Sequence, residues 1–248
     1  MKYIVGDIGN TSTKISLLNN SFLIIKTLSF DTKKLFIKNY IKKHIKKISK
    51  TDINNIILFS SVVPLGLKEI KKSFRGSKYK IVEIKNLNLK KIIKINIKKV
   101  SQLGSDRIAN AIGGKKFKNC LIVDFGTATT FDVVKNSIYE GGVIAPGVSQ
   151  SIKNLNQSTA LLPMFNLKNS NKSYGKNTKE ALNAGFIWGY EGLINNIINK
   201  ITLNWKNKYK IILTGGYANF FRRMIKKKTI VDQNITIKGI SSIYKKLI

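Results

Sequence analysis

Short apolar runs separated by polar turns begin the chain and predict a β-rich start. The runs at 3–5, 14–18 and 22–25 predict three strands, with a tight turn at Gly6–Asn10 between the first two. From Leu35 to Ile48 the spacing of apolar residues changes to three or four, which predicts one amphipathic helix. The run at 56–59 predicts a buried strand that ends at Ser60–Pro64.

The second half of the chain predicts further strands and two clear helices. A helix is expected at 105–113, with Ser105 as its N-cap, and a long one at about 178–201. Asn177 and Glu180 have the spacing of a capping box at the start of the long helix. Strands are expected at 120–123, 131–134 and 211–213.

An internal repeat relates the two halves. A strand, the turn Asp7-Ile8-Gly9-Asn10-Thr11 and a second strand open the chain, and a strand, the turn Asp124-Phe125-Gly126-Thr127 and a second strand recur later. Such a repeat predicts two similar α/β halves. We place them at 1–114 and 115–248, packed directly on one another because no Pro- or Ser-rich linker separates them.

Length and composition fit a folded protein outside the membrane. The 248 residues are 43% apolar, and no uninterrupted apolar run approaches the ~18 residues of a membrane span. Asp7 interrupts the start of the chain before a signal-peptide core could form. A single cysteine excludes a disulfide framework and any multi-cysteine metal site. We therefore expect a cytoplasmic protein.

The charge is unusual. There are 45 Lys and Arg residues against 12 Asp and Glu, a formal net charge of +33, which is typical of proteins that bind nucleic acid or anionic membranes. However, lysines dominate and are spread along the chain among Ile and Asn, whose codons can also be A/T-rich. A biased genome and a selected polyanion-binding surface both remain open as causes.

The two aspartate-bearing turns are the first candidates for chemistry. Glycine exposes backbone N–H groups in such a turn, and these groups together with threonine hydroxyls can hold phosphate oxygens. An aspartate there suits a cation, or a water on Mg²⁺, that bridges the phosphates. One such turn is usually a simple hairpin, whereas two with the same pattern favour a nucleotide site.

A third carboxylate follows at Leu103-Gly104-Ser105-Asp106-Arg107. The helix N-terminus expected there favours an ionised Asp106, which could accept the proton of a substrate hydroxyl during phosphoryl transfer. Arg107 could hold a carboxylate or phosphate through its planar fork. A salt bridge at the helix start is the alternative interpretation.

Two glycine-rich segments and two isolated residues complete the candidates. Paired glycines at Thr214-Gly215-Gly216 allow close approach of a ring or a phosphate, and Glu140–Gly147 is bent by glycine and proline. His44 lies on an apolar stripe and Cys120 in an expected buried strand, so we expect both to pack. One histidine and one cysteine leave no basis for a zinc site.

Taken together, these segments resemble the type III pantothenate kinases, over nearly the whole chain and in the family's order. The matching segments are Asp7-Ile8-Gly9-Asn10-Thr11 with Lys14, Ser60-Ser61-Val62-Val63-Pro64, Gly104-Ser105-Asp106-Arg107, Asp124-Phe125-Gly126-Thr127-Ala128, Gly141–Gly147, Thr159–Pro163, Asn177-Thr178 and Lys238–Tyr244.

The resemblance implies a fold and an activity. The fold would be α/β, with two duplicated ribonuclease H-like domains of the actin, Hsp70 and sugar kinase type and an interdomain cleft. The activity would be ATP-dependent phosphorylation of pantothenate to 4'-phosphopantothenate, the first step toward coenzyme A. Members are usually homodimers that use Mg²⁺ and a monovalent cation, K⁺ or NH₄⁺.

The resemblance also implies roles for individual residues. Asp106 would be the catalytic base, and Asp124 would bind the monovalent cation. Pantothenate would contact Gly104, Ser105, Asp106, Arg107 and Thr178, and ATP would contact Asp7, Ile8, Gly9, Asn10, Thr11, Ser12, Thr13, Lys14 and Thr127. Ile97 stands where the family often has a substrate-lining tyrosine, so we expect either a reshaped pocket there or a shifted segment at 94–100.

Two alternative functions remain open from sequence. A related small-molecule or sugar kinase on the same fold is favoured by the Ile97 departure. A non-catalytic regulator associated with nucleic acid is favoured by the net charge of +33, and the retained Asp7, Asp106, Asp124 and Thr127 argue against it.

Overall fold

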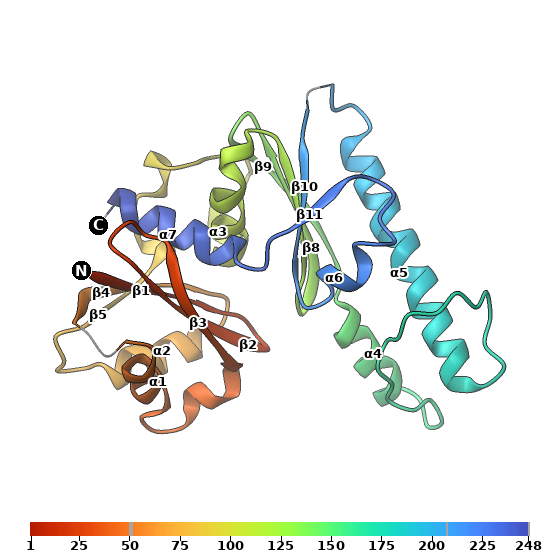
Figure 1. The fold of residues 1–248 in the computed structure, drawn as a ribbon, viewed down its shortest axis with the longest axis horizontal. Helices are drawn as coiled ribbons and strands as arrows, with labels where there is room; N and C mark the ends of the chain where they lie inside the picture. The colour runs from red at the N-terminus through yellow and green to blue at the C-terminus, as the bar shows by residue number, and fades with distance from the viewer. Residues whose placement is uncertain (50–51, 207, 248) are drawn as a thin grey trace. The chain divides into compact units, whose positions relative to one another are not determined.

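The computed structural model describes residues 1–49, 52–206 and 208–247 and contains two sheets with flanking helices (Figure 1). The 3-10 helices are labelled η. The first elements are β1 (Lys2–Ile8), β2 (Ser12–Leu18), β3 (Ile24–Asp31), η1 (Thr32–Phe36), α1 (Tyr40–Ile48), β4 (Ile53–Ser61), α2 (Pro64–Ser73), β5 (Lys80–Glu83), η2 (Ile84–Asn86), η3 (Leu89–Lys91), β6 (Lys94–Ile95), η4 (Val100–Gln102), α3 (Ser105–Gly114) and η5 (Lys115–Phe117). The others are β7 (Cys120–Phe125), β8 (Ala128–Lys135), β9 (Ile138–Pro146), α4 (Val148–Gln157), α5 (Thr178–Thr202), β10 (Lys210–Gly215), α6 (Ala218–Phe221), β11 (Thr229–Val231) and α7 (Ile235–Leu247).

The two sheets repeat one topology. The first has the order β3-β2-β1-β4-β5, and the second has the order β9-β8-β7-β10-β11 with β6 added at the β9 edge. In each sheet the first strand lies at the centre, with a parallel strand beside it: β4 beside β1, and β10 beside β7. The repeated turns therefore follow corresponding central strands.

Two compact units divide the described chain. One contains Met1–Lys118, Val134–Gly141 and Asn234–Ile248, and the other contains Asn119–Val133 and Gly142–Gln233. These units differ from the expected halves 1–114 and 115–248, because the C-terminal helix α7 packs on α3 and so belongs to the first unit. Gly239 lies so close to the Ala109 carbonyl that no Cβ would fit there, and Gly113 meets Ile235 in the same way.

The first unit packs helices on both faces of its sheet (Figure 1). A buried cluster joins β1, β2 and β4 to α1 and α2 and includes Ile8, Ile41, Ile57 and Ile70. On the other face, the Tyr244 hydroxyl of α7 lies 2.7 Å from the Ile56 carbonyl oxygen of β4. This packing fixes the carboxyl ends of β1 and β4.

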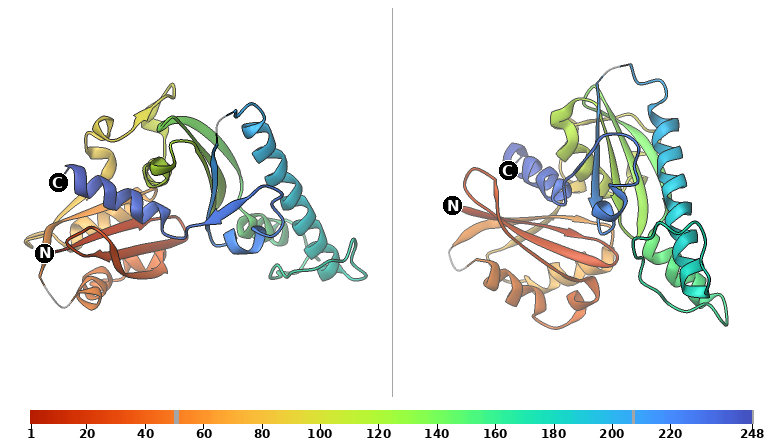
Figure 2. Two further views of the ribbon diagram at one scale, coloured as in Figure 1. Left: turned by 45° about the horizontal axis from the view of Figure 1, so that its top comes forward. Right: turned by 45° about the vertical axis from the view of Figure 1, so that its right-hand side comes forward.

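The second unit buries its sheet against α4, α5 and α6. Its apolar cluster includes Val123 and Leu213 from the sheet and Ile152, Ile194 and Phe221 from the helices. Figure 2 shows α5 as the longest helix of the unit, with the segment at 158–177 leading into it. Within the described residues, no helix combines the length and apolar character needed to cross a bilayer.

Several predicted elements differ in detail. The single helix expected at 35–48 is wrong, because η1 and α1 are separated by Asn39, which adopts a left-handed φ of 61°. The strand expected at 22–25 starts at Ile24, since Phe22 lies in a turn with a φ of 62°. β1 continues through Asp7 to Ile8, so the first turn starts at Gly9 rather than Gly6.

The helix starts are partly as predicted. Ser105 is not an N-cap: Gly104 caps α3 without a side chain, and Ser105 is already helical. At α5 the Asn177 side chain accepts a hydrogen bond from Glu180 N at 3.0 Å, as predicted. The Glu180 carboxylate, however, accepts from Lys176 N at 3.1 Å, one residue before the N-cap.

Candidate active site

The first aspartate-bearing turn joins β1 to β2. Gly9 N donates to Ser12 O at 3.0 Å and closes the turn, which leaves Asn10 and Thr11 exposed at its tip. Ile8 and Thr13 flank the turn and are fully buried. The exposed tip and its backbone groups are therefore what this turn can offer to a ligand.

Thr32 clamps the turn from the start of η1. Its hydroxyl donates to Gly9 O at 2.6 Å, and its backbone N donates to Thr11 O at 3.0 Å. The Thr13 hydroxyl lies 3.0 Å from that of Thr32, which it can reach as a donor. Thr32 was missed from the sequence because no local motif marks a residue that contacts a turn two strands away.

The carboxyl ends of β1 and β4 lie next to each other. Asp7 pairs in register with Ser60, and Ser61 is tied to the first residue of α3. Ser61 N donates to Ser105 Oγ at 2.8 Å, and Ser105 Oγ donates to Ser61 O at 2.8 Å. These bonds bring the Gly104–Arg107 segment to the same sheet edge as the first turn.

Asp106 presents a largely buried carboxylate at that edge. Its Oδ1 accepts from Arg107 N at 2.8 Å, and a Cβ on Gly104 would stand 2.5 Å from Oδ1. The carboxylate can lie across Gly104 only because glycine has no side chain. Burial raises the pKa of Asp106, and the amide and charge of Arg107 partly offset this rise. Desolvation therefore opposes the lowering of the Asp106 pKa that the helix N-terminus predicts from the sequence.

The other two expected substrate residues of this unit are half-buried. Arg107 follows Asp106 on α3, with its backbone N on the Asp106 carboxylate. Ile97 follows β6, and its Cγ2 lies 3.7 Å from the position of a Cβ on Gly141, whose φ is +120°. Ile97 thus packs on the glycine-rich strand β9, within reach of the bend at Gly141.

The second aspartate-bearing turn joins β7 to β8. Gly126 N donates to Ala128 O at 3.1 Å, and Gly126 and Thr127 are exposed. Gly147, the N-cap of α4, lies so close to the Thr127 carbonyl that a Cβ would collide with it. Because Gly147 has no side chain, the start of α4 packs directly on the backbone of Gly126 and Thr127.

The glycine pair after β10 lies beside the same turn. Gly215 has a φ of +85°, and a Cβ there would stand 2.6 Å from both Asp124 Oδ1 and Phe125 O. Gly216 N donates to Phe125 O at 3.0 Å. The half-buried carboxylate of Asp124 thus lies directly against glycine backbone.

The donors around Asp124 suit a hard cation. A carboxylate with nearby carbonyl oxygens is the ligand type that such cations prefer. In the described part of the chain no three His, Cys, Asp or Glu side chains are grouped as a dedicated metal cluster. The set therefore fits a cation that completes its shell with water or substrate oxygens.

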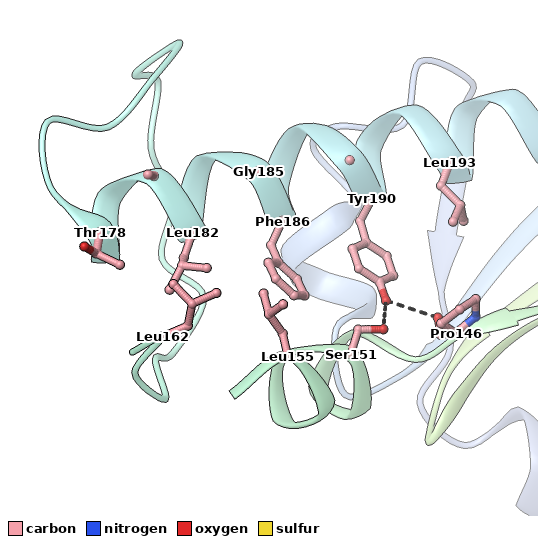
Figure 3. Close-up of a pocket in the computed structure, with 12 residues that line it drawn as sticks. Pro146, Ser151, Leu155, Leu162, Thr178, Leu182, Gly185, Phe186, Tyr190 and Leu193 are labelled. Atoms are coloured by element: carbon pink, nitrogen blue, oxygen red, sulfur yellow. Dashed lines mark hydrogen bonds between the residues drawn. The ribbon is translucent and has the colours of Figure 1, made fainter. Parts of the chain in front are cut away.

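A cavity of about 640 Å³ lies between α4 and α5 (Figure 3). Thr178 lines one end, and the Tyr190 hydroxyl lies 2.7 Å from Ser151 Oγ and 3.3 Å from Pro146 O. Most of the remaining wall is apolar, from Leu155, Leu162, Ala181, Leu182, Phe186 and Leu193. The sequence had predicted Thr178 as a binding residue but gave no indication of this cavity.

The two isolated residues pack as expected. The His44 ring stacks on Tyr40 with centroids 4.0 Å apart. Cys120 is fully buried, and burial, with a further contribution from the Asp132 charge, raises its pKa to about 12. The Cys120 thiol is therefore not a reactive nucleophile near neutral pH.

Comparisons with known proteins give one consistent family. The family model described as type III pantothenate kinase matches residues 3–200. A protein named type III pantothenate kinase from Pelagibacter ubique is 47% identical over 239 residues, 96% of each chain. Another of that name from a Sulfurihydrogenibium species is 35% identical, over 94% of this chain and 96% of its own.

Solved structures share the fold at low identity. A conserved putative Baf family transcriptional activator from Campylobacter jejuni has a TM-score of 0.64 at 23% identity, covering 98% of this chain and 97% of that one. A putative 2-dehydro-3-deoxygalactonokinase from Sinorhizobium meliloti has a TM-score of 0.61 at 10% identity, covering 98% of both. These likenesses concern the fold alone, and they confirm the predicted α/β class with two duplicated halves.

Proposed function

Because this chain belongs to the type III pantothenate kinase family, we propose that it transfers the γ-phosphoryl group of ATP to the hydroxyl of pantothenate. The product, 4'-phosphopantothenate, begins the route to coenzyme A. The observation that carries the proposal is the Asp106 carboxylate, held across Gly104 at the sheet edge where the Asp7 strand also ends.

Asp106 acts as the base in this proposal. Its ionised carboxylate accepts the proton of the attacking hydroxyl, while Arg107 holds the carboxylate of pantothenate through its planar fork. Since the phosphoryl transition state is loose, positioning and electrostatics supply most of the rate and the base a smaller share. Gly104, Ser105, Thr178 and Ile97 are proposed as further pantothenate contacts.

ATP is held through both aspartate-bearing turns. Asn10, Thr11 and Ser12 offer exposed polar groups in the first turn, and Thr127 offers one in the second. Lys14 adds a positive charge on β2, and Asp7 lies where β1 reaches the turn. Ile8 and Thr13 are fully buried, and Gly9 N is bonded to Ser12 O, so these three residues shape the turn.

Two cations complete the nucleotide site. Mg²⁺ would be held by the ATP phosphates and by Asp7, directly or through water. A monovalent cation, K⁺ or NH₄⁺, would be held by Asp124, whose carboxylate is enclosed by the Gly215 backbone. When bound, the cations offset phosphate charge.

A homodimer is the proposed assembly. Gly185, Gly189 and Gly192 lie on α5 with open space where their Cβ atoms would be, although each glycine costs a helix about 1 kcal/mol relative to alanine. Such a face permits close approach of a second helix. Light scattering from the purified protein measures the assembly, and a monomeric mass at assay concentration would contradict it.

The cytoplasm is the proposed location. ATP is available there, and the one cysteine, Cys120, is a buried thiol, as is usual in a reducing compartment.

A turnover assay tests the proposed activity. Purified protein is given ATP, Mg²⁺ and pantothenate, with K⁺ or with Na⁺ alone, and compared with a panel of other hydroxy acids and sugars. We expect one ADP per phosphopantothenate formed, and faster turnover with K⁺. Preference for a sugar or another hydroxy acid, or no ADP with pantothenate, would contradict the proposal.

A further inference from the structure

A buried glutamate ends β5 beside the start of α3. Glu83 is 8% exposed and pairs in register with Phe59 of β4, the residue before Ser60. Its Oε2 accepts from Lys85 N at 2.9 Å. Burial raises the pKa of Glu83, and the neighbouring Ser105 hydroxyl and Lys85 amide partly offset the rise.

The Ser105 hydroxyl is a neighbour of this glutamate but bonds elsewhere. Ser105 Oγ donates its proton to Ser61 O at 2.8 Å, and within the described residues Glu83 Oε1 is buried without a hydrogen-bond partner. A buried carboxylate with an unsatisfied oxygen costs free energy that an apolar side chain would not.

Two residues later, Lys85 holds the chain that leads into the Gly104–Arg107 segment. Its Nζ donates to Ser101 O at 3.0 Å and to Leu103 O at 3.0 Å. Ser101 lies in η4, and Leu103 directly precedes Gly104. Lys85, in η2 directly after β5, thus holds the chain just before Gly104 through two backbone carbonyls.

We propose that Lys85 is a positioning residue that holds the Gly104–Arg107 segment in the geometry required for phosphoryl transfer. It acts through the Ser101 and Leu103 carbonyls, and the role rests on the function proposed above. The contacts matter because the segment before α3 has only the short elements β6 and η4 to order it. A shift of about 1 Å at a reacting group can lower turnover by roughly a hundredfold.

Lys85→Met is the primary test because the Lys85 side chain is exposed and its loss leaves the core intact. We expect kcat to fall about tenfold, with the KM for ATP within about twofold of wild type, because the displaced segment serves the acceptor. Lys85→Arg keeps the donors and should recover most of the loss. Lys80→Met, at the exposed start of the preceding strand β5, is the matched control and should keep wild-type kinetics.

Unchanged kcat in Lys85→Met, or an equal loss in Lys80→Met, would overturn the positioning role. So would a loss in Lys85→Met that Lys85→Arg does not recover.

A second readout separates this role from the proposed function. Carboxyl ¹³C titration of Asp106 needs no substrate, and Lys85→Met should move the pKa of Asp106 toward its ordinary value as water reaches a loosened segment. If the wild type does not phosphorylate pantothenate, the proposed function fails and this shift decides the positioning role. An unchanged titration would then overturn it.

Discussion

The position of the Asp106 carboxylate depends on the absence of a Cβ atom at Gly104, since glycine has no side chain. A Cβ at Gly104 would stand 2.5 Å from Asp106 Oδ1, well inside van der Waals contact. The motif and the helix start predict a role for Asp106. They do not show how far burial opposes the effect of the helix N-terminus, because that burial comes from segments distant in sequence, such as β4, whose Ser61 is hydrogen-bonded to Ser105.

Gly104→Ala tests this arrangement. The new methyl group should push the carboxylate out of place and lower kcat by roughly 10- to 100-fold, because the base is then misaligned. Nucleotide affinity, measured by isothermal titration calorimetry, should stay within about threefold, since the phosphate-binding turns are unchanged. Wild-type turnover in a folded Gly104→Ala protein would contradict the proposed placement of the base.

The pH dependence of kcat/KM follows from the burial of Asp106. The group must be ionised to accept a proton, and its folded-state pKa is raised, so activity should fall as pH drops through a midpoint above the ~3.9 of an ordinary aspartate. The residual rate of Asp106→Asn should lack this limb. An acid limb at or below the ordinary aspartate value would contradict the burial argument.

At the scale of elements, local patterns identified the repeated turns and the ends of α5. They were unable to divide the helix expected at 35–48, because apolar spacing continues across Asn39 and only the left-handed backbone there breaks the helix. Thr32 and Lys85 were also missed. Each is hydrogen-bonded to a segment that is distant in sequence, and no short motif encodes such a contact.

The support of the second turn by α4 gives a prediction at this scale. In Gly147→Ala the added Cβ would collide with the Thr127 carbonyl, so the turn or the start of α4 must shift. Affinity for ATP should fall about tenfold or more, measured by calorimetry. Gln150→Ala, on the exposed face of α4, is the control and should bind ATP normally. Equal affinity in both variants would remove α4 from this role.

At the scale of the whole molecule, the C-terminal helix returns to the first unit. The expected boundary at Gly114 follows the repeat in the sequence, whereas α7 packs on α3 through Gly239 and Gly113. No sequence motif marks Gly113 and Gly239 as helix contacts. Their role depends on which helix packs against them, so the packing of α7 on α3 could not be predicted from the sequence alone.

The net charge of +33 also belongs to this scale. Lysines spread over the chain should give weak duplex DNA binding without sequence preference, with affinity that falls steeply as salt rises. At ~150 mM salt, added DNA should leave pantothenate turnover unchanged. Fluorescence anisotropy and the coupled ADP assay measure the two effects. Tight, sequence-specific binding at that salt would instead favour the nucleic-acid-associated alternative.

Asp106→Asn most directly tests the central claim, because it removes the base while keeping the shape of the side chain. Turnover of ATP with pantothenate and nucleotide affinity are measured on the same preparation. The account predicts that kcat falls by roughly 10²–10⁴ while ATP binds as in the wild type. Wild-type kcat in this variant would contradict the assignment of Asp106 as the group that accepts the hydroxyl proton.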